Sequence, residues 1–302
     1  MTVSASGDMT FGSRLDGARA RLGRVVSHSR RPALAIPLAI LGLLVSLAVF
    51  GPLLWPKGPL AVDLGSALQA PSLAHPMGTD ELGRDVFARF LEGARISLGI
   101  GVLVVVVGAA IGGAIGIVSG TLGGWVDGVS MRIMDALLAF PPLVLAMAVT
   151  VGLGVGLRSA ALGIMLTSVP WYARVLRSEV LRVRATPFVE AISVLGATRR
   201  RLMNRHILPH VLPTLLIQAA AVFGYAILAL AALSFVGLGA QLPTPEWGAM
   251  ITEGLPYALG GQWWISIFPG VGILLLVVSS GLLADRARDI LDPQARHSIL
   301  PE

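Results

Sequence analysis

Five stretches of more than 20 residues lack Asp, Glu, Lys and Arg, and they limit the fold of the chain more than any other feature. They cover 33–54, 96–126, 136–157, 206–245 and 254–284. A helix needs about 20 mostly apolar residues to cross a bilayer. A sixth apolar stretch, 159–173, is shorter, but near its end it has Trp171 and Tyr172, whose side chains favour the membrane interface. The sequence therefore predicts an all-α membrane protein with six transmembrane helices.

The composition agrees with a membrane protein. Hydrophobic residues make up 55% of the chain and charged residues 13%, with a mean hydropathy of +0.79, whereas soluble domains carry roughly 25% charged residues. The chain has no cysteine, which excludes disulfides and thiolate metal ligands. The first apolar stretch is longer than the core of a cleaved signal and follows a basic arm, so we expect an uncleaved anchor.

Positive charge orients the chain. With the N-terminus inside, 18 of the 23 Lys and Arg residues fall in inside segments. Both termini are then cytoplasmic, and residues 174–209 form a cytoplasmic loop. The expected parts of the chain are a mobile basic cytoplasmic arm (1–30), the first transmembrane helix (31–55), an outer segment with an amphipathic helix (56–94), a five-helix core (95–295) and a C-terminal tail (296–302).

The residues of the loop 174–209 predict two short helices. Thr186 can cap a helix that begins with Pro187, and Glu190 favours the positive end of that helix. Gly196 can end it in the left-handed conformation that glycine tolerates. A second helix is expected to start near Thr198 and to stop before Pro209. Its exposed side would carry Arg199, Arg200, Arg201 and Arg205. Such a projection suits docking to another protein, while a topology signal that touches anionic lipid is the simpler alternative.

The loop also resembles the cytoplasmic loop of ABC importer permease subunits. That family has Glu-Ala-Ala, three residues, Gly, nine residues and Ile-x-Leu-Pro. The residues in register here are Glu190, Ala191, Gly196, Leu208 and Pro209. Ile192 and His206 depart from the pattern, and "RHILP" is similar to the dipeptide and oligopeptide branch. The resemblance implies a type I importer permease fold and a coupling helix in a groove of the ATPase, with Glu190 and Arg199 to Arg201 as contacts.

The outer segment resembles the C-type peptide permeases of the peptide and nickel branch. Its stretch "HPMGTDELGRDVFARFLEGARISLGIG" (75–101) holds the signature Gly78, Thr79, Asp80, Gly83, Arg84 and Asp85. The pattern predicts an amphipathic helix capped by Thr79 or Asp80, with its apolar face on Leu82, Val86, Phe87, Phe90 and Leu91. Glu81–Arg84 and Asp85–Arg89 would pair on the exposed face. The helix either shapes the outer surface or takes part in gating.

Other stretches extend the resemblance over about residues 30 to 295. They are "MRIMDALLAFPPLVLA" (131–146), "LSFVGLGAQLPTPEWGAMITEG" (233–254) and "ADRARDILDP" (284–293). We also expect a pair between Arg132 and Asp135, a kink of the third helix at Pro141 and Pro142, and close helix packing at the glycines 108, 112 and 116.

Several functional classes are excluded by the residues. The apolar stretches hold no ionisable relay of the kind that ion-coupled carriers use. Lys57 is the sole lysine and follows "LLWP", so no P-loop is present. No paired carboxylates, nucleophilic triad or metal cluster is apparent, and the histidines 28, 75, 206, 210 and 297 suit loops or interfaces. We expect a non-catalytic subunit without a metal or cofactor of its own, and no nucleic-acid partner.

The resemblance implies the pore-forming subunit of an ABC importer for dipeptides or short oligopeptides in the bacterial cytoplasmic membrane. Its expected partners are a second homologous permease subunit, two ATPase subunits that bind ATP and Mg, an extracytoplasmic peptide-binding protein and membrane lipids. The same signatures fit import of nickel chelates, glutathione, haem or another small solute. An alternative of a different class is an ATPase-independent channel or membrane scaffold. The substrate-contacting residues stay unassigned.

Overall fold

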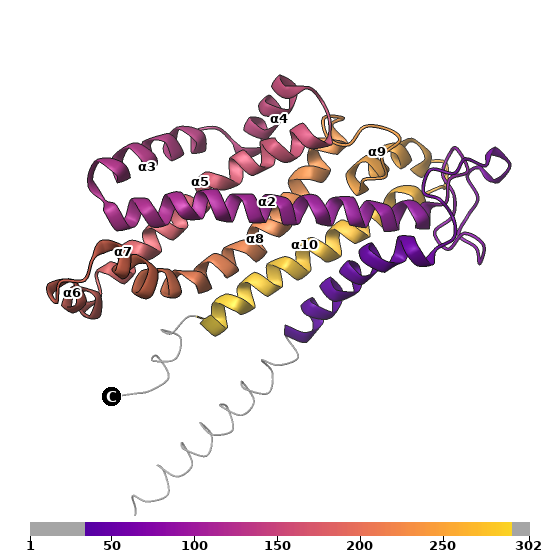
Figure 1. Cartoon of the computed structure of the whole chain (residues 1–302). Helices are drawn as coiled ribbons and strands as arrows, with labels where there is room; N and C mark the ends of the chain where they lie inside the picture. Colours follow the sequence, from indigo (N-terminus) through magenta and orange to yellow (C-terminus); the bar gives the residue numbers. More distant parts are fainter. Residues whose placement is uncertain (1–33, 292–302) are drawn as a thin grey trace, which may run out of the picture.

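The computed structural model describes residues 34–291, without the side chains of Glu190, Ser193, Arg199, Arg200 and Leu291. This part of the chain is helical, with one isolated β-bridge between Thr79 and Asp85 (Figure 1). The predicted arm 1–30 and tail 296–302 lie outside the described residues.

A helix over Leu34–Leu54 precedes an outer segment built mostly of turns and the remaining helices. The elements that follow are η1 (Leu64–Ser66), α2 (Val86–Leu122), α3 (Gly124–Leu138), α4 (Pro142–Leu153), α5 (Leu157–Arg184), α6 (Pro187–Val194), α7 (Arg199–Leu202), the π-helical turn η2 (Met203–Ile207), α8 (Leu208–Phe235), α9 (Trp247–Ala258) and α10 (Trp264–Leu291).

Long apolar helices dominate the bundle, as the charge-free stretches predict. Four of the described helices are long and apolar enough to cross a membrane, namely Leu34–Leu54, α2, η2 with α8, and α10. A bent pair, α3 with α4, raises the number to five if it is one span. The 28-residue α5 is the remaining long helix, and it runs on into the predicted loop 174–209 as far as Arg184, with the first five charged residues of that loop in its C-terminal half.

Close packing of α2 against α5 confirms the glycine prediction. A Cβ atom at Gly112 would overlap the backbone oxygen of Val169, and one at Gly116 would overlap that of Ala173. At Gly108 it would meet the Ser168 hydroxyl. The glycines thus let the two backbones approach within a distance that no side chain permits.

In two places the structure has two helices where the sequence predicts one. The expected kink at Pro141 is a full break, since α3 and α4 meet at 87°. Pro142 starts α4, where a missing N–H costs no hydrogen bond. The apolar stretch 254–284 is likewise divided between α9 and α10, with Gly261 at φ +95° in the turn.

Ion pairs fasten α3 to α5 near one end of the bundle. Arg177 donates two hydrogen bonds to Asp127, at 2.5 and 2.6 Å, and Asp127 also accepts from the Ser119 hydroxyl. Asp135 pairs with Arg174 at 2.5 Å, so the expected partner Arg132 was wrong. A partner three residues away was less well placed than one on the helix packed alongside.

Candidate functional site

The two segments singled out from the sequence lie at opposite ends of the bundle. Figure 1 shows the outer segment and α9 at one end, and α6 with α7 at the other. All six residues of the outer signature are buried, whereas the tip of the loop 174–209 is largely exposed. The two sites therefore have different tasks, and each is built differently.

Tight turns, rather than a helix, hold the outer signature. The Asp80 carboxylate accepts from the backbone N–H of Leu82 and of Arg84, at 3.0 and 2.9 Å. Gly83 has φ +72°, and a Cβ atom there would collide with the backbone of Asp63. The helix expected from Thr79 or Asp80 was wrong: α2 begins at Val86, capped by the Asp85 carboxylate, which accepts from the N–H of Ala88 at 2.8 Å.

A cluster of buried ion pairs ties these turns to α9. Arg84 donates to Asp80 at 2.6 Å, to Glu81 at 3.0 Å and to Glu253 at 2.9 Å. Arg89 donates to Glu253 at 2.7 Å. Only 3% of Arg84 and 1% of Arg89 is exposed. The Glu81–Arg84 pair is thus confirmed but not its exposure, and Arg89 pairs with Glu253 rather than with Asp85.

Burial and the neighbouring arginines shift the pKa of the Glu253 carboxyl in opposite directions. Burial raises the pKa of the Glu253 carboxyl, and the lowering effect of Arg89 and Arg84 does not cancel that rise. Oxygens of Asp80, Glu81 and Glu253 lie within 4.8 Å of one another, a spacing that a cation could bridge. The guanidinium groups of Arg84 and Arg89 already neutralise most of the negative charge of these three carboxylates. The geometry therefore fits a network of buried ion pairs between the outer turns and α9, which is called the ion-pair lock below.

Two tryptophans extend the lock into the bundle. The Trp264 indole donates to the backbone oxygen of Thr79 at 3.0 Å, and the Trp247 indole donates to that of Phe90 at 3.0 Å. Glu246 caps α9 through the N–H groups of Gly248 and Ala249. Sequence reasoning assigned no role to these residues, although Glu246, Trp247 and Glu253 stand in the stretch 233–254 that carries the resemblance.

The loop 174–209 contains the expected pair of short helices. Pro187 begins α6, and Gly196 takes the left-handed conformation, with φ +83°, between α6 and α7. Thr198 accepts from the N–H of Arg201 at 3.3 Å and so caps α7. The Thr186 hydroxyl donates to the carbonyl of Val183, and its expected role as a cap acceptor for α6 stays a prediction.

Helical structure continues through Pro209, contrary to the expected stop. The π-turn η2 connects α7 to α8, and Pro209 lies in the first turn of α8. A proline is tolerated there because the first-turn N–H groups lack intrahelical partners. The loop therefore joins α8 as a rigid extension.

An apolar cluster anchors the loop while its tip remains open. Val189 of α6 is buried with Leu176 and Val180 of α5 and with Ile207 and Val211. Val194 and Leu195, at the other end of α6, are 82% and 86% exposed. An anchored helix with exposed apolar residues at its end is typical of a docking surface.

The remaining predicted loop residues fall on this framework. Ala191, Arg201 and Pro209 are exposed, and His206 and Leu208 are half-buried. The His206 ring packs edge-on against Phe188, with the ring centres 5.5 Å apart. Glu190 lies in α6 and Arg199 and Arg200 lie in α7, but their side chains are outside the described part of the structure. Their predicted contacts remain predictions.

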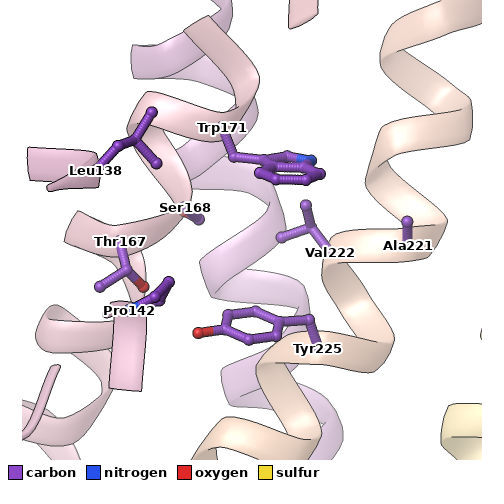
Figure 2. A pocket seen from close by; sticks show the side chains of 8 residues that line it. All are labelled: Leu138, Pro142, Thr167, Ser168, Trp171, Ala221, Val222 and Tyr225. Carbon is purple, nitrogen blue, oxygen red and sulfur yellow. The ribbon is translucent and has the colours of Figure 1, made fainter. Parts of the chain in front are cut away.

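A third feature, which the sequence did not indicate, is a cavity of about 220 Å³ between the two ends. Leu138 and Pro142 border it at the break between α3 and α4, and Thr167, Trp171, Val222 and Tyr225 line it from α5 and α8 (Figure 2). Uniformly apolar helix faces hid these positions from periodicity analysis.

Comparison with known proteins gives consistent matches over most of the chain. Residues 112–297 match the family described as "Binding-protein-dependent transport system inner membrane component". A probable D,D-dipeptide transport system permease protein of Escherichia coli K12 is 45% identical over 256 residues, which are 85% of this chain and 86% of that protein. The dipeptide transport system permease protein of Alkalihalophilus pseudofirmus OF4 is 39% identical over 86% of each chain.

Two further matches concern a second substrate name and the fold. A glutathione transport system permease protein of Escherichia coli O1:K1 is 42% identical over 78% of this chain and 77% of that protein. Among solved structures, an inward-facing conformation of the MetNI methionine ABC transporter matches with a TM-score of 0.55 and 20% identity, over 67% of this chain and 96% of that one. At this identity the structural match speaks for the fold alone.

Proposed function

Because the chain belongs to the family of binding-protein-dependent transport system inner membrane components, we propose that it carries dipeptides or short oligopeptides across the cytoplasmic membrane as the permease subunit of an ABC importer. Two of its similar relatives are named as dipeptide permeases. The observation that carries the mechanism is the anchored, exposed pair α6 and α7, which continues α5 directly into η2 and α8.

Six membrane crossings fit the arrangement of the helices. They are Leu34–Leu54, α2, the bent pair α3 and α4, α5, α8 and α10. In Figure 1 the C-terminal ends of α2 and α5 point toward the end that carries α6 and α7, and α10 runs in the same direction. This supports a topology with both termini and the loop 174–209 in the cytoplasm, and with residues 56–85 outside.

The loop at 174–209 would dock on an ATPase subunit and pass its movement to α5 and α8. Val194, Leu195 and Arg201 are exposed on the docking side, and Glu190, Arg199 and Arg200 are proposed contacts of the same surface. ATP and Mg would be bound by the two ATPase subunits, and this chain would contribute no catalytic residue. ATP binding would draw the loops of two permease subunits together and turn the cavity outward, and hydrolysis would reset it.

At the outer end, the buried cluster around Arg84 and Arg89 would present a fixed surface to a peptide-binding protein. The six signature residues act there as positioning residues, because each is buried and bonded within the segment. The second permease subunit would complete the pathway. Relatives named for dipeptides and for glutathione both match. Competition between these two substrates for transport would show which one the complex prefers.

The test is peptide-stimulated ATPase activity of the complex reconstituted with its partner subunits. Leu195→Asp removes an apolar side chain that the docked ATPase subunit would cover. Losing the burial of one leucine costs about 2 kcal/mol, so ATPase binding should weaken by roughly tenfold or more. Gly196→Ala strains the loop at φ +83°, and Gly123→Ala is its matched control, with φ +66° and equally open surroundings.

The stimulation of ATPase activity by peptide should fall in Leu195→Asp and Gly196→Ala and persist in Gly123→Ala. Wild-type coupling in both loop variants would remove the docking role and favour a channel or scaffold. Equal losses in the two glycine variants would indicate general strain. A wild-type complex that responds to glutathione but not to dipeptides would replace the substrate class.

A further inference from the structure

One face of α3 carries a hollow of about 320 Å³. Its lining residues all belong to this helix, and they are Trp125, Gly128, Val129, Arg132 and Ile133. Spacings of three and four residues put them on one side of the helix. The other side is packed on α5, because Met134 is buried against Val169 and Ala173. The hollow therefore faces away from the helix that holds α3 in place.

The side chain of Arg132 is available to a partner. It is exposed and has no hydrogen bond or ion pair among the described residues. The acidic residues of α3 are engaged elsewhere, since Asp127 binds Arg177. Asp135 likewise binds Arg174. The lining itself contains no acidic residue. A guanidinium group in such a position attracts an anion, and its planar set of donors matches the oxygens of a phosphate group.

Apolar side chains surround this charge. Trp125 is 81% exposed, Ile133 is 54% exposed and Val129 is 39% exposed. Gly128 leaves the space between them open, because a Cβ atom there would meet nothing within 4 Å. A free phosphate ion would gain nothing from these side chains. A molecule that joins a phosphate group to acyl chains would use both the charge and the apolar surface, and tryptophan is typical of the membrane interface where such molecules lie.

The place of α3 in the bundle brings Arg132 to the membrane surface. The helix begins directly after α2, at the end of α2 that lies toward α6 and α7 (Figure 1). The 37 residues of α2 span about 55 Å, whereas the hydrocarbon core of a bilayer is about 30 Å thick. The turn between α2 and α3 thus reaches beyond the hydrocarbon. Arg132 follows about two helical turns later, and helical side chains lean toward the N-terminus, here toward the lipid headgroups.

Resting on the membrane orientation proposed above, we propose that this hollow binds an anionic phospholipid of the cytoplasmic leaflet. Its phosphate group lies on the Arg132 guanidinium, and an acyl chain packs against Trp125 and Ile133. An anionic headgroup is favoured over a zwitterionic one, because no carboxylate in the lining would receive an ammonium or choline group. The lipid supports the side of α3 that α5 does not contact.

The experiment uses the full complex in proteoliposomes of equal parts phosphatidylglycerol and phosphatidylcholine. The photoreactive residue p-benzoylphenylalanine replaces Trp125, one of the two lipids is radiolabelled in each sample, and the lipid that light attaches to this chain is counted. A control sample carries the photoreactive residue in place of Leu282 of α10, which is 44% exposed. That position reports the bulk lipid composition.

Three substitutions are combined with the photoreactive residue at position 125. Arg132→Gln removes the charge, and Gly128→Phe fills the hollow. Arg288→Gln is the matched control, because Arg288 is exposed on α10 and likewise has no hydrogen bond or ion pair in the described part of the chain. None of the three replaced side chains is buried, so the fold should tolerate each change.

We expect phosphatidylglycerol to label position 125 about fivefold more than phosphatidylcholine, as for one arginine near an anionic lipid surface. The two lipids should label position 282 equally. Arg132→Gln and Gly128→Phe should remove the preference at position 125, and Arg288→Gln should keep it.

Equal labelling of position 125 by the two lipids would overturn the inference. Cross-links from this position only to the second permease subunit would do the same, because the face would then be a subunit interface. Lipid labelling requires no transport. A complex that fails to carry peptide would therefore refute the proposed function and leave the lipid site standing.

Discussion

Arg89 is the most consequential residue of the outer cluster. Only 1% of it is exposed, and its guanidinium bonds Glu253 at 2.7 Å. Removing one partner of a buried pair leaves the other charge uncompensated, at a cost of about 3 kcal/mol or more. Arg89→Met should therefore lower the thermal unfolding temperature of the purified protein in detergent.

Arg95 supplies the control for that measurement, because it lies on the same helix and is exposed. Arg95→Met should change stability by less than about 0.5 kcal/mol. Equal unfolding temperatures for the two variants would show that the Arg89 cluster contributes no net stability.

Glu253 gives this cluster a defined pH response. Burial raises its pKa in the folded protein above the ordinary value of 4.5. Folding therefore favours the protonated form, so its stabilising contribution is complete below pH 4.5 and is lost as pH rises through the raised pKa. Relative to Glu253→Gln, which cannot titrate, the wild-type free energy of unfolding should fall across that window and then level off. A constant difference between the two proteins from pH 4 to pH 8 would contradict the raised pKa.

At the residue scale, the sequence predicted local relations better than distant ones. The pair Glu81–Arg84 and the glycine turn at Gly196 depend on neighbours within a few residues, and both are present. The partner of Arg89 lies 164 residues away, so no local spacing could reveal it. The same reason explains the miss at Asp135, whose partner Arg174 is on another helix.

At the scale of elements, the glycines of α2 make a prediction with opposite signs. Gly99 has open surroundings, so Gly99→Ala should stabilise α2 by up to about 1 kcal/mol. Gly112→Ala would press a methyl group into the backbone of α5 and should destabilise by about 1–3 kcal/mol. Unfolding in detergent with a denaturant series measures both. Stabilisation by both substitutions would show that α2 and α5 are not held in close contact.

Element boundaries were harder to predict than element existence. The pattern Leu82, Val86 and Phe90 fits a helix, yet Gly83 and the Asp80 side chain turn the chain before Val86. Pro142 could equally kink a helix or begin one, and the choice depended on packing against α5. Two helices meeting at a glycine were predicted in the loop 174–209, because Pro187, Gly196 and Thr198 each act on adjacent backbone.

For the whole molecule, the absence of cysteine permits a direct test of orientation. Leu73 in the outer segment is fully exposed, and Leu195 in the docking loop is 86% exposed. A membrane-impermeant maleimide should label Leu73→Cys in cells whose outer surface of the cytoplasmic membrane is accessible. Leu195→Cys should react only after that membrane is opened. Labelling of both from the same side would rule out the six-crossing topology.

The lock between the outer turns and α9 also affects how the chain is made. Glu253 leaves the ribosome 164 residues after Arg89, roughly ten to thirty seconds later at ordinary rates of synthesis. Until then Arg84 has only Asp80 and Glu81 as partners and Arg89 has only Asp80, so the contact between the outer turns and α9 is still missing. Biogenesis must therefore tolerate an unfinished lock, and a nascent chain arrested before residue 253 should be a preferred substrate for membrane quality-control proteases.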